Sequence, residues 1–204
     1  MHIAIAGNIG SGKTTLTELL AKHFQWEPHY ESVENNPYLN SFYEDMQRWS
    51  FNLQIYFLNS RFKQIISIRQ SGKTVIQDRT IYEDAHIFAP NLHSMNLMST
   101  RDYDNYTSLF DLINSLIQPP DLLIFLRASV PTLVQQIQKR GREYENAIRL
   151  DYLKNLNERY EEWITRYTLG KLLIVDVDTI KFSESPEYLG EVIDRVNAEL
   201  HGLF

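Results

Sequence analysis

Glycines, a lysine and two threonines are closely spaced near the start of the chain. Residues 7–14 read Gly-Asn-Ile-Gly-Ser-Gly-Lys-Thr and match the pattern G-x-x-x-x-G-K-[ST]. A strand-like run at residues 3–6 comes before it, and a helix-like pattern begins at Lys13. In this setting glycines let backbone N–H groups surround phosphate oxygens, and the helix N-terminus adds donors and partial positive charge. The pattern predicts binding of a nucleoside triphosphate. The alternative, a glycine-rich turn without a ligand, is disfavoured by eight matching positions in the right setting.

Two side chains of this loop have expected roles of their own. Lys13 is expected to reach the β- and γ-phosphates, and the Thr14 hydroxyl is expected to complete the oxygen shell of Mg²⁺. The other residues expected to contact phosphate are Gly7, Asn8, Ile9, Gly10, Ser11, Gly12 and Thr15.

An acid and a cation, Asp78 and Arg79, follow a second strand-like run at residues 74–77. The carboxyl end of a parallel strand is where open α/β sheets bind ligands. There Asp78 is suited to orienting a metal-bound water and Arg79 to meeting the acceptor oxygen or the transferred phosphate. An ordinary surface ion pair is the alternative. The chain has no N-K-x-D sequence, which a GTPase would use to read its base. A motor or AAA-type ATPase usually has an apolar strand that ends in two acidic residues, whereas this run ends in one.

Three cations, Lys139, Arg140 and Arg142, come just after an apolar helical pattern. Phosphoryl transfer needs positive charge on the equatorial oxygens and exclusion of water, which a mobile arginine-bearing lid commonly supplies. The alternative is a solvated helix end, where basic residues are favourable for their own sake. Taken together with the phosphate-binding loop and the Asp-Arg pair, these cations favour a small kinase.

Strand-like and helix-like segments alternate along the chain and would have to position these groups. Strands are predicted at residues 2–6, 27–30, 74–77, 121–126 and 171–177, and helices at residues 13–24, 50–69, 103–117, 131–140, 149–167 and 186–200. Three of the strands are almost continuously apolar, which is typical of strands covered on both faces of a parallel sheet. The alternation predicts a doubly wound α/β fold in one domain spanning residues 1–204. Residues 91–102 are expected to form a surface loop.

Composition excludes several classes of protein. The chain has 204 residues and no cysteine, so disulfides, thiol catalysis and cysteine zinc sites are excluded, and its six histidines lack metal-ligand spacing. Twenty basic and twenty-six acidic residues give a net charge of −6, which disfavours duplex nucleic acid as a partner. No stretch approaches the roughly 18 apolar residues of a membrane span, and the first residues do not resemble a signal peptide. A cytoplasmic location is expected.

Six segments resemble the deoxyribonucleoside kinase family, especially the bacterial deoxyadenosine/deoxyguanosine kinases. They are GNIGSGKTT (7–15), YESVENNPYL (30–39), FYEDMQRWSFNLQIYFLNSR (42–61), QDRTIYEDAHIFA (77–89), KRGREYE (139–145) and DVDTIKF (176–182). The third and fourth are the specific ones, since many kinases share the first. The resemblance implies a P-loop kinase fold with a five-stranded parallel sheet flanked by helices and an arginine-bearing lid at about residues 139–149. It also implies ATP and Mg²⁺, a deoxynucleoside acceptor and a homodimer.

The resemblance also implies roles on the acceptor side. Glu31 matches the catalytic glutamate that accepts the proton of the 5′-hydroxyl, which agrees with the need of an alcohol nucleophile for a base. Asp78 and Arg79 match a D/E-R-S motif, with Thr80 in place of serine. The residues that match the family's nucleoside pocket are Gln54 at the base edge, Arg61 and Asp84 as a pair lining the base, Phe88 stacked under it, and Tyr43 and Glu145 at the sugar 3′-hydroxyl.

On the donor side, Arg140 and Arg142 match the lid arginines, and residues 176–182, with Asp178 and Phe182, match the loop beside the adenine of ATP. Two positions depart from the family. Ser32 follows Glu31 where a proline is common, and Gln136 occupies the position of an arginine found in human relatives. Phosphate clamping would then rest on Lys13, Arg140 and Arg142, with Lys139 as a substitute.

Several alternatives stay open at this point. The aromatic residues of the nucleoside-pocket segments could simply be core, but Gln54 on an apolar helix would be a buried amide that needs a ligand or a hydrogen-bond network. A nucleoside monophosphate kinase such as thymidylate kinase would share the sheet, loop and lid but would need extra cations for the acceptor's phosphate. A non-catalytic nucleotide-binding subunit would need neither Lys13, Glu31 nor Arg79.

Overall fold

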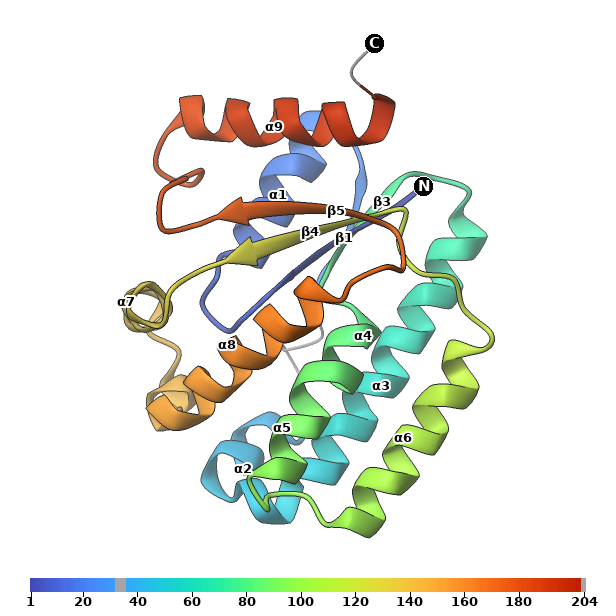
Figure 1. Ribbon diagram of the computed structural model, residues 1–204, viewed down its shortest axis with the longest axis vertical. Helices are drawn as coiled ribbons and strands as arrows, with labels where there is room; N and C mark the ends of the chain where they lie inside the picture. Colours follow the sequence, from blue (N-terminus) through green and yellow to red (C-terminus); the bar gives the residue numbers. More distant parts are fainter. Residues whose placement is uncertain (32–35, 203–204) are drawn as a thin grey trace.

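Five parallel strands form the centre of the molecule. The computed structural model describes residues 1–31 and 36–202, the side chain of Asn146 excepted. The strands are β1 (His2–Gly7), β2 (Glu27–His29), β3 (Val75–Asp78), β4 (Leu122–Arg127) and β5 (Lys171–Asp176), in the order β2-β3-β1-β4-β5 (Figure 1). This confirms the expected sheet. Because β1 has neighbours that come later in the chain on both sides, the loop that follows it lies at the point where open α/β sheets bind ligands.

Six long helices were expected and all are present. They are α1 (Lys13–Phe24), α3 (Met46–Ser71), α6 (Thr100–Asn114), α7 (Val130–Arg140), α8 (Leu150–Thr165) and α9 (Pro186–His201). Five short helical segments were not expected: α2 (Leu39–Glu44), α4 (Ile81–Glu83), the π-helical turn η1 (Asp84–Phe88), α5 (Ala89–Ser94) and the 3₁₀ turn η2 (Glu143–Ala147).

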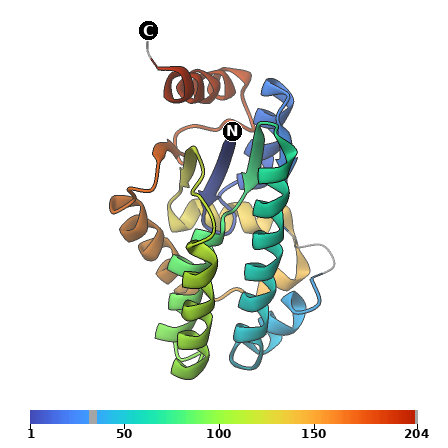
Figure 2. The same cartoon turned by 90° about the vertical axis from the view of Figure 1, so that its right-hand side faces the viewer.

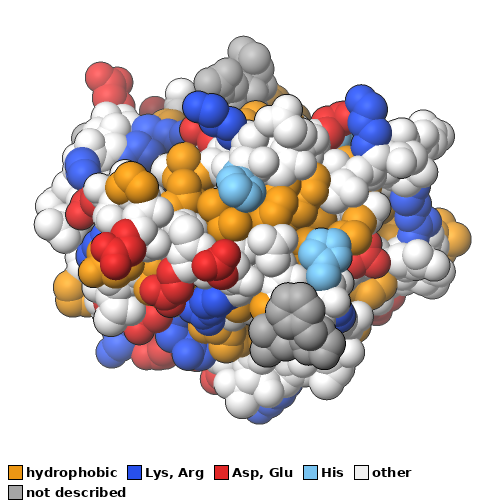
Figure 3. Space-filling model, turned by 90° about the horizontal axis from the view of Figure 1, so that it is seen from above, with side chains coloured by type: hydrophobic (Ala, Val, Ile, Leu, Met, Phe, Trp, Pro, Cys, Tyr) orange, Lys and Arg blue, Asp and Glu red, His pale blue; other side chains and the backbone are white. Residues whose placement is uncertain are grey.

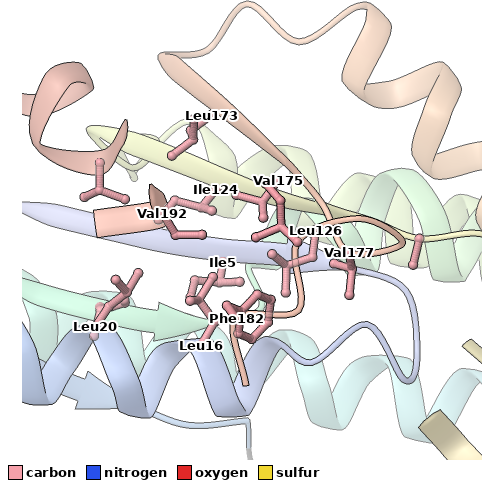
Figure 4. Close-up of a cluster of buried hydrophobic side chains, with 14 of the residues drawn as sticks. Ile5, Leu16, Leu20, Ile124, Leu126, Leu173, Val175, Val177, Phe182 and Val192 are labelled. Carbon is pink, nitrogen blue, oxygen red and sulfur yellow. The ribbon is translucent and has the colours of Figure 1, made fainter. Parts of the chain in front are cut away.

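The helices cover both faces of the sheet, and alternate strand residues point to opposite sides. Ile3 and Ile5 belong to one buried cluster with Leu16 and Leu20 of α1 and Val192 and Val196 of α9. Ile5, Leu16, Leu20 and Val192 are labelled in Figure 4. Ala4 and Ala6 face the other side, against α3, α5 and α8. Each strand residue that is withdrawn from water on either face adds hydrophobic stabilisation of about 25 cal/mol per Å² of apolar area. Unbroken apolar strands are the consequence of this double coverage.

Helix α3 is longer than expected at its N-terminal end. The side chain of Asp45 accepts a hydrogen bond from the backbone N–H of Arg48 at 3.0 Å and caps the helix, which begins at Met46, four residues before the predicted start. The helix ends at Gly72, whose φ of 64° is the left-handed conformation that a glycine adopts without strain. The extra turn brings the N-terminal part of α3 next to α2.

Residues 91–102 are not the surface loop that was expected. Asn91 and Leu92 lie in α5 and are fully buried, and Met98 is buried as well. Leu92 and Met98 pack in the cluster that covers the lower face of the sheet. Pro90, just before this stretch, falls in the first turn of α5, where its missing N–H costs no helical hydrogen bond, so the helix continues into residues 91–94.

None of the helices in the described part of the chain combines the length and the apolar character needed to cross a bilayer. On the face over α9, acidic and basic side chains lie interspersed among apolar and uncharged ones (Figure 3). This distribution is in line with the nearly balanced totals of 20 basic and 26 acidic residues.

Candidate active site

The loop between β1 and α1 is held in shape by close packing from two sides. A side-chain carbon at Gly10 would lie 2.8 Å from the carbonyl oxygen of Leu133 in α7, and Gly10 has a φ of 86°. Gly12 has a φ of 91°, and the ring of Phe182 packs against it. Both positions therefore demand glycine, the first for space and the second for backbone conformation. Phe182 supports the loop from behind and belongs to the core beneath α9.

Helix α1 begins directly at this loop, and its N-terminus has no side-chain cap. The first N–H groups of a helix lack intrahelical partners, so here they remain available to an anion. Lys13 is buried at the same point, and its Nζ donates to the Asn8 carbonyl at 3.0 Å. Burial, reinforced by the positive charge of Arg79, lowers the pKa of Lys13 to about 8, although Asp78 and Glu31 act in the opposite direction. Lys13 is therefore a buried cation whose nearby carboxylates do not fully offset the cost of burial.

Asn8 fastens the loop to α8 rather than pointing into the open space. Its Nδ2 donates to the carbonyl of Leu153 and to Oδ1 of Asn157, each at 3.1 Å, and its own Oδ1 accepts from the backbone N–H of Ile9 at 2.8 Å. Asn157 in turn donates to the carbonyl of Ala128 at 3.2 Å. The side chain of Asn8 therefore sets the position of the loop.

Asp78 and Thr14 meet at the end of β3. The hydroxyl of Thr14 donates to Oδ2 of Asp78 at 2.5 Å, while Oδ1 of Asp78 is buried and has no hydrogen-bond partner among the described residues. Burial raises the pKa of Asp78. A hydroxyl and a carboxylate with a free oxygen are the hard ligands that Mg²⁺ prefers, so this pair fits the expected metal. Within the described residues no group of three His, Asp or Glu side chains is placed to hold a metal alone, so nucleotide and water oxygens would have to supply the remaining ligands.

Arg79 has an unusual backbone and a crowded side chain. Its φ of 69° is the left-handed region, which costs a non-glycine residue on the order of 1–2 kcal/mol. Its guanidinium lies over the ring of Phe88, 4.7 Å from the centroid, and Nε lies 3.0 Å from Oε1 of Glu31. Such strained positions persist only where surrounding contacts hold them, and they cluster at functional sites.

The carboxylate of Glu31 pairs with two arginines. Its Oε1 accepts from Nη2 of Arg61 at 2.8 Å and pairs with Arg79. Burial alone would raise the pKa of Glu31, but Arg79 and Arg61 outweigh it and lower the pKa to about 2. Glu31 is therefore a carboxylate at neutral pH, two residues after the end of β2.

Arg61 and Asp84 form the buried pair that the resemblance implied. Nε of Arg61 donates to Oδ2 of Asp84, from α3 to the π-helical turn η1. Burial raises the pKa of Asp84 to about 6, an effect that Arg61 partly offsets. Nearby, Oε1 of Gln54 is buried without a hydrogen-bond partner among the described residues. A buried amide oxygen left unpaired costs about 1–3 kcal/mol, which a ligand that donates a hydrogen bond would recover.

Arg140 and Arg142, which were expected to belong to a lid, both turn toward Glu145. Nε of Arg140 donates to Oε2 of Glu145 at 3.0 Å and its Nη2 donates to Oε1, while Nη1 of Arg142 lies 3.6 Å from Oε1. Arg142 also donates to the hydroxyl of Tyr144 at 3.1 Å, and the ring of Tyr144 stacks on Tyr43 with 5.6 Å between centroids. The predicted sugar-binding and phosphate-binding residues are therefore joined in one cluster between α7 and α8.

A cavity of about 820 Å³ connects these groups at the carboxyl edge of the sheet. The expected site residues that line it are Ile9, Gly10, Gly12, Lys13, Thr14, Thr15, Glu31, Tyr43, Gln54, Asp78, Arg79, Asp84, Phe88, Arg140, Arg142 and Glu145. Gln136 and Lys139 line it as well. The volume falls within the range of small-molecule pockets, and the lining mixes apolar rings with a few convergent polar groups.

Six expected site residues do not line the cavity: Gly7, Asn8, Ser11, Arg61, Asp178 and Phe182. Arg61 acts through Glu31 and Asp84. Asp178 accepts from the backbone N–H of Ser129 at 3.1 Å with each carboxylate oxygen, at the start of α7. The expected place of Asp178 and Phe182 beside an adenine stays a prediction.

Sequence reasoning missed several residues of the wall. Leu39 and Phe42 in α2, Tyr144 in η2 and Tyr152 in α8 all line the cavity. Two fully buried polar residues behind the wall, Glu83 and Tyr160, were missed as well. Tyr160 lies with Leu153, Leu156 and Ile164 at three- and four-residue spacing on the buried face of α8, and no local pattern distinguishes a core tyrosine whose hydroxyl is hydrogen-bonded.

Comparison with known proteins gives consistent matches over nearly the whole chain. The family model described as deoxynucleoside kinase matches residues 3–201. A deoxyadenosine/deoxycytidine kinase of Bacillus subtilis (strain 168) is 40% identical over 204 residues, covering 98% of this chain and 93% of that protein. A deoxyguanosine kinase of Lactobacillus johnsonii is 37% identical, covering 97% and 92%.

Solved structures agree with the sequence matches. Deoxyadenosine kinase from M. mycoides, solved with the products dCMP and a flexible dCDP bound, superimposes with a TM-score of 0.87 at 31% identity. The match covers 97% of this chain and 100% of that one. The same enzyme with bound dATP gives a TM-score of 0.86.

Proposed function

The chain belongs to the deoxynucleoside kinase family, and from this we propose that it transfers the γ-phosphoryl group of ATP to the 5′-hydroxyl of a deoxynucleoside. Deoxyadenosine and deoxyguanosine are the preferred acceptors, and deoxycytidine is a further one. The observation that carries the proposal is a single cavity that joins a phosphate-binding loop to an ionised glutamate and an unpaired buried amide.

Glu31 accepts the proton of the acceptor hydroxyl in this proposal. The low pKa of Glu31, about 2, keeps it ionised at neutral pH, although the same shift makes it a weak base. Catalysis by such a group depends on geometry: it must lie within hydrogen-bond reach of the hydroxyl as negative charge develops on the attacking oxygen. Arg79, which shares Oε1 of Glu31, is placed to meet the transferred phosphoryl group.

Gln54, Asp84 and Phe88 recognise the base. Phe88 offers a ring for stacking, and the buried Oε1 of Gln54 can accept a hydrogen bond from an exocyclic amine. Adenine, guanine and cytosine carry such an amine, whereas thymine has none and adds a methyl group. Relatives named as deoxyadenosine/deoxycytidine and deoxyguanosine kinases support acceptors with these bases.

Donor binding rests on Lys13 and on the first N–H groups of α1, with Thr14 and Asp78 as the residues that would hold Mg²⁺. The metal, when bound, would neutralise charge on the β- and γ-phosphates. Residues 139–149 act as the lid, with Arg140 and Arg142 moving from Glu145 to the phosphates and leaving Glu145 to the sugar 3′-hydroxyl. Lys139, which lines the cavity, is available beside Gln136, where human relatives carry an arginine.

A monophosphate kinase fits the cavity less well. Its acceptor carries a phosphate of its own, which needs cations on the acceptor side. In the described part of the cavity that side presents Glu31, Tyr43 and Gln54. Arg61 and Arg79 are already paired with carboxylates. A second phosphate there would meet the negative charge of Glu31.

The proposal includes a C₂ homodimer that pairs α3 and α6. These helices run side by side below the sheet (Figure 2). The exposed large apolar side chains in or next to them are Ile66 in α3, Leu109 and Leu112 in α6, and Leu116 just after α6. Leu112 and Leu116 are 62% and 60% exposed. An isologous interface would bury this patch against its own copy. The cytoplasmic location also stays a prediction.

Turnover on a panel of acceptors tests the proposal. Purified protein with ATP and Mg²⁺ is assayed for ADP release with deoxyadenosine, deoxyguanosine, deoxycytidine, thymidine, dAMP and dTMP. We expect the highest kcat/KM with a purine deoxynucleoside, measurable turnover with deoxycytidine and the lowest with thymidine. Turnover restricted to dAMP or dTMP would identify a monophosphate kinase, and nucleotide binding without turnover would identify a non-catalytic subunit.

A further inference from the structure

Glu83 is a fully buried carboxylate that serves three elements at once. Its Oε2 accepts from the backbone N–H of Thr80 at 2.7 Å and closes the capping box of α4. Its Oε1 accepts from the backbone N–H of Gly7 at 3.2 Å, the first residue of the phosphate-binding loop. The same oxygen lies 3.3 Å from Nη1 of Arg79. One carboxylate therefore joins the loop, the strained arginine and the helix that follows it.

Tyr160 completes this group from a distant part of the chain. Its hydroxyl accepts from Nη1 of Arg79 at 2.7 Å and donates to Oε1 of Glu83 at 2.8 Å. The residue is fully buried in α8, with its ring stacked near Phe125 at 5.8 Å between centroids. The hydroxyl thus has one donor and one acceptor on the two residues that flank it, and both bonds are of normal length.

The charges explain why two carboxylates are needed around Arg79. The guanidinium is buried, and its Nε lies by Oε1 of Glu31 while Nη1 lies by Oε1 of Glu83. If Glu83 were neutral, Glu31 would become the nearest remaining negative partner of Arg79. The arginine could then turn toward Glu31, the group proposed as the base, and away from the phosphate-binding loop.

We propose that Glu83 and Tyr160 are positioning residues that fix the guanidinium of Arg79 between the phosphate-binding loop and Glu31. This role rests on the proposed kinase function and extends it to residues that touch neither substrate in the cavity. It also links α8, which follows directly after the lid segment, to Arg79. Leu153, Asn157 and Tyr160 lie three to four residues apart on one face of α8, and that face contacts both Asn8 and Arg79.

Two features separate this role from simple packing. A glutamine can replace a glutamate in a capping box, so the caps on Thr80 and Gly7 do not require the negative charge of Glu83. A phenylalanine would keep the ring contact of Tyr160 with Phe125, so packing does not require its hydroxyl. The negative charge of Glu83 and the hydroxyl of Tyr160 are therefore the features that hold Arg79 in place.

Steady-state kinetics of Tyr160→Phe and Glu83→Gln test the proposal. We expect kcat to fall about 10-fold in Tyr160→Phe and about 100-fold in Glu83→Gln, with KM for ATP and for deoxyadenosine changed less than about 3-fold, because misplacing a catalytic group affects the transition state more than binding. Tyr167→Phe is the matched control, since the hydroxyl of Tyr167 is also buried and has no hydrogen-bond partner among the described residues. Its kcat should stay within about 2-fold of wild type.

A double-mutant cycle with Arg79→Lys separates positioning from stability. If the hydroxyl of Tyr160 acts through the guanidinium, Tyr160→Phe should have little further effect on kcat in the Arg79→Lys background. Equal effects in both backgrounds, or kcat of Tyr160→Phe within about 2-fold of wild type, would overturn the proposal. If Glu83→Gln does not fold, the cycle of Tyr160→Phe and Arg79→Lys still tests the proposal. A wild-type protein without phosphoryl transfer would instead refute the proposed function itself.

Discussion

Replacing Lys13 by methionine should destroy activity and at the same time stabilise the protein without ligands. Lys13 is buried, and within the described part of the chain its Nζ donates one hydrogen bond, to the Asn8 carbonyl at 3.0 Å. Burial lowers the pKa of Lys13 from 10.5 to about 8, which at about 1.4 kcal/mol per pKa unit means that the charged form costs about 3 kcal/mol in the folded state. Methionine has a similar shape and no charge, so this cost disappears.

The expected gain in free energy of unfolding is smaller than the full cost of burying the charge of Lys13. The variant also loses the hydrogen bond to Asn8, worth about 1 kcal/mol, so about 2 kcal/mol of stabilisation should remain. For a chain of this length that corresponds to a rise in Tm of roughly 4–8 °C. With ATP bound, wild type should be the more stable of the two proteins. At a hundredfold excess of ATP over Kd the free energy of unfolding of wild type rises by about 2.7 kcal/mol, whereas that of the variant rises little.

Urea and thermal unfolding at pH 7, with EDTA and without nucleotide, measure the difference. The pH dependence has a definite sign. The neutral lysine carries no cost, so the advantage of Lys13→Met is complete below pH 8 and shrinks to zero as pH rises toward 10.5. Lys22→Met, on the exposed side of α1, serves as the control and should change stability by less than about 0.5 kcal/mol. A Lys13→Met protein that is less stable than wild type at pH 7 would refute the reasoning.

Three further predictions concern the base, the pocket and the assembly. Glu31→Gln should lower kcat about 10²–10⁴-fold with little change in deoxynucleoside affinity measured by calorimetry. If the variant kept more than about a tenth of wild-type kcat, another residue would have to be the general base. Asp84→Ala should reduce the preference for deoxyadenosine over thymidine about 10-fold or more in competition kinetics, and an unchanged ratio would contradict the pocket assignment. Leu112→Glu should convert a dimer to the 24.0 kDa protomer in light scattering, with Leu169→Glu as the exposed control; a wild-type protein that is already monomeric at micromolar concentration would rule the dimer out.

The phosphate-binding loop could be predicted from the sequence because it is local. Its glycines, Lys13 and Thr14 are adjacent, and the loop, strand and helix that carry them form one continuous segment. The long apolar strands and amphipathic helices were predictable for the same reason, since burial on one or two faces leaves a period in the sequence. The helical segments between residues 81 and 94 follow one another without a gap, but the π-helical turn at Asp84–Phe88 interrupts the regular α-helical period that would have predicted them.

The contacts across the site required the tertiary structure. That Arg61 joins Glu31 to Asp84, and that Tyr160 holds Arg79 from 81 positions away, follows from how α3, α4 and α8 pack below the sheet. Resemblance to a family indicated which residues belong to the pocket, but it gave no partner for Glu83. A hydrogen bond between distant segments leaves no local pattern, because either residue alone has the composition of ordinary core. The sequence therefore determined which chemistry the chain can perform, and the packing of its helices decided which side chains hold the reacting groups in place.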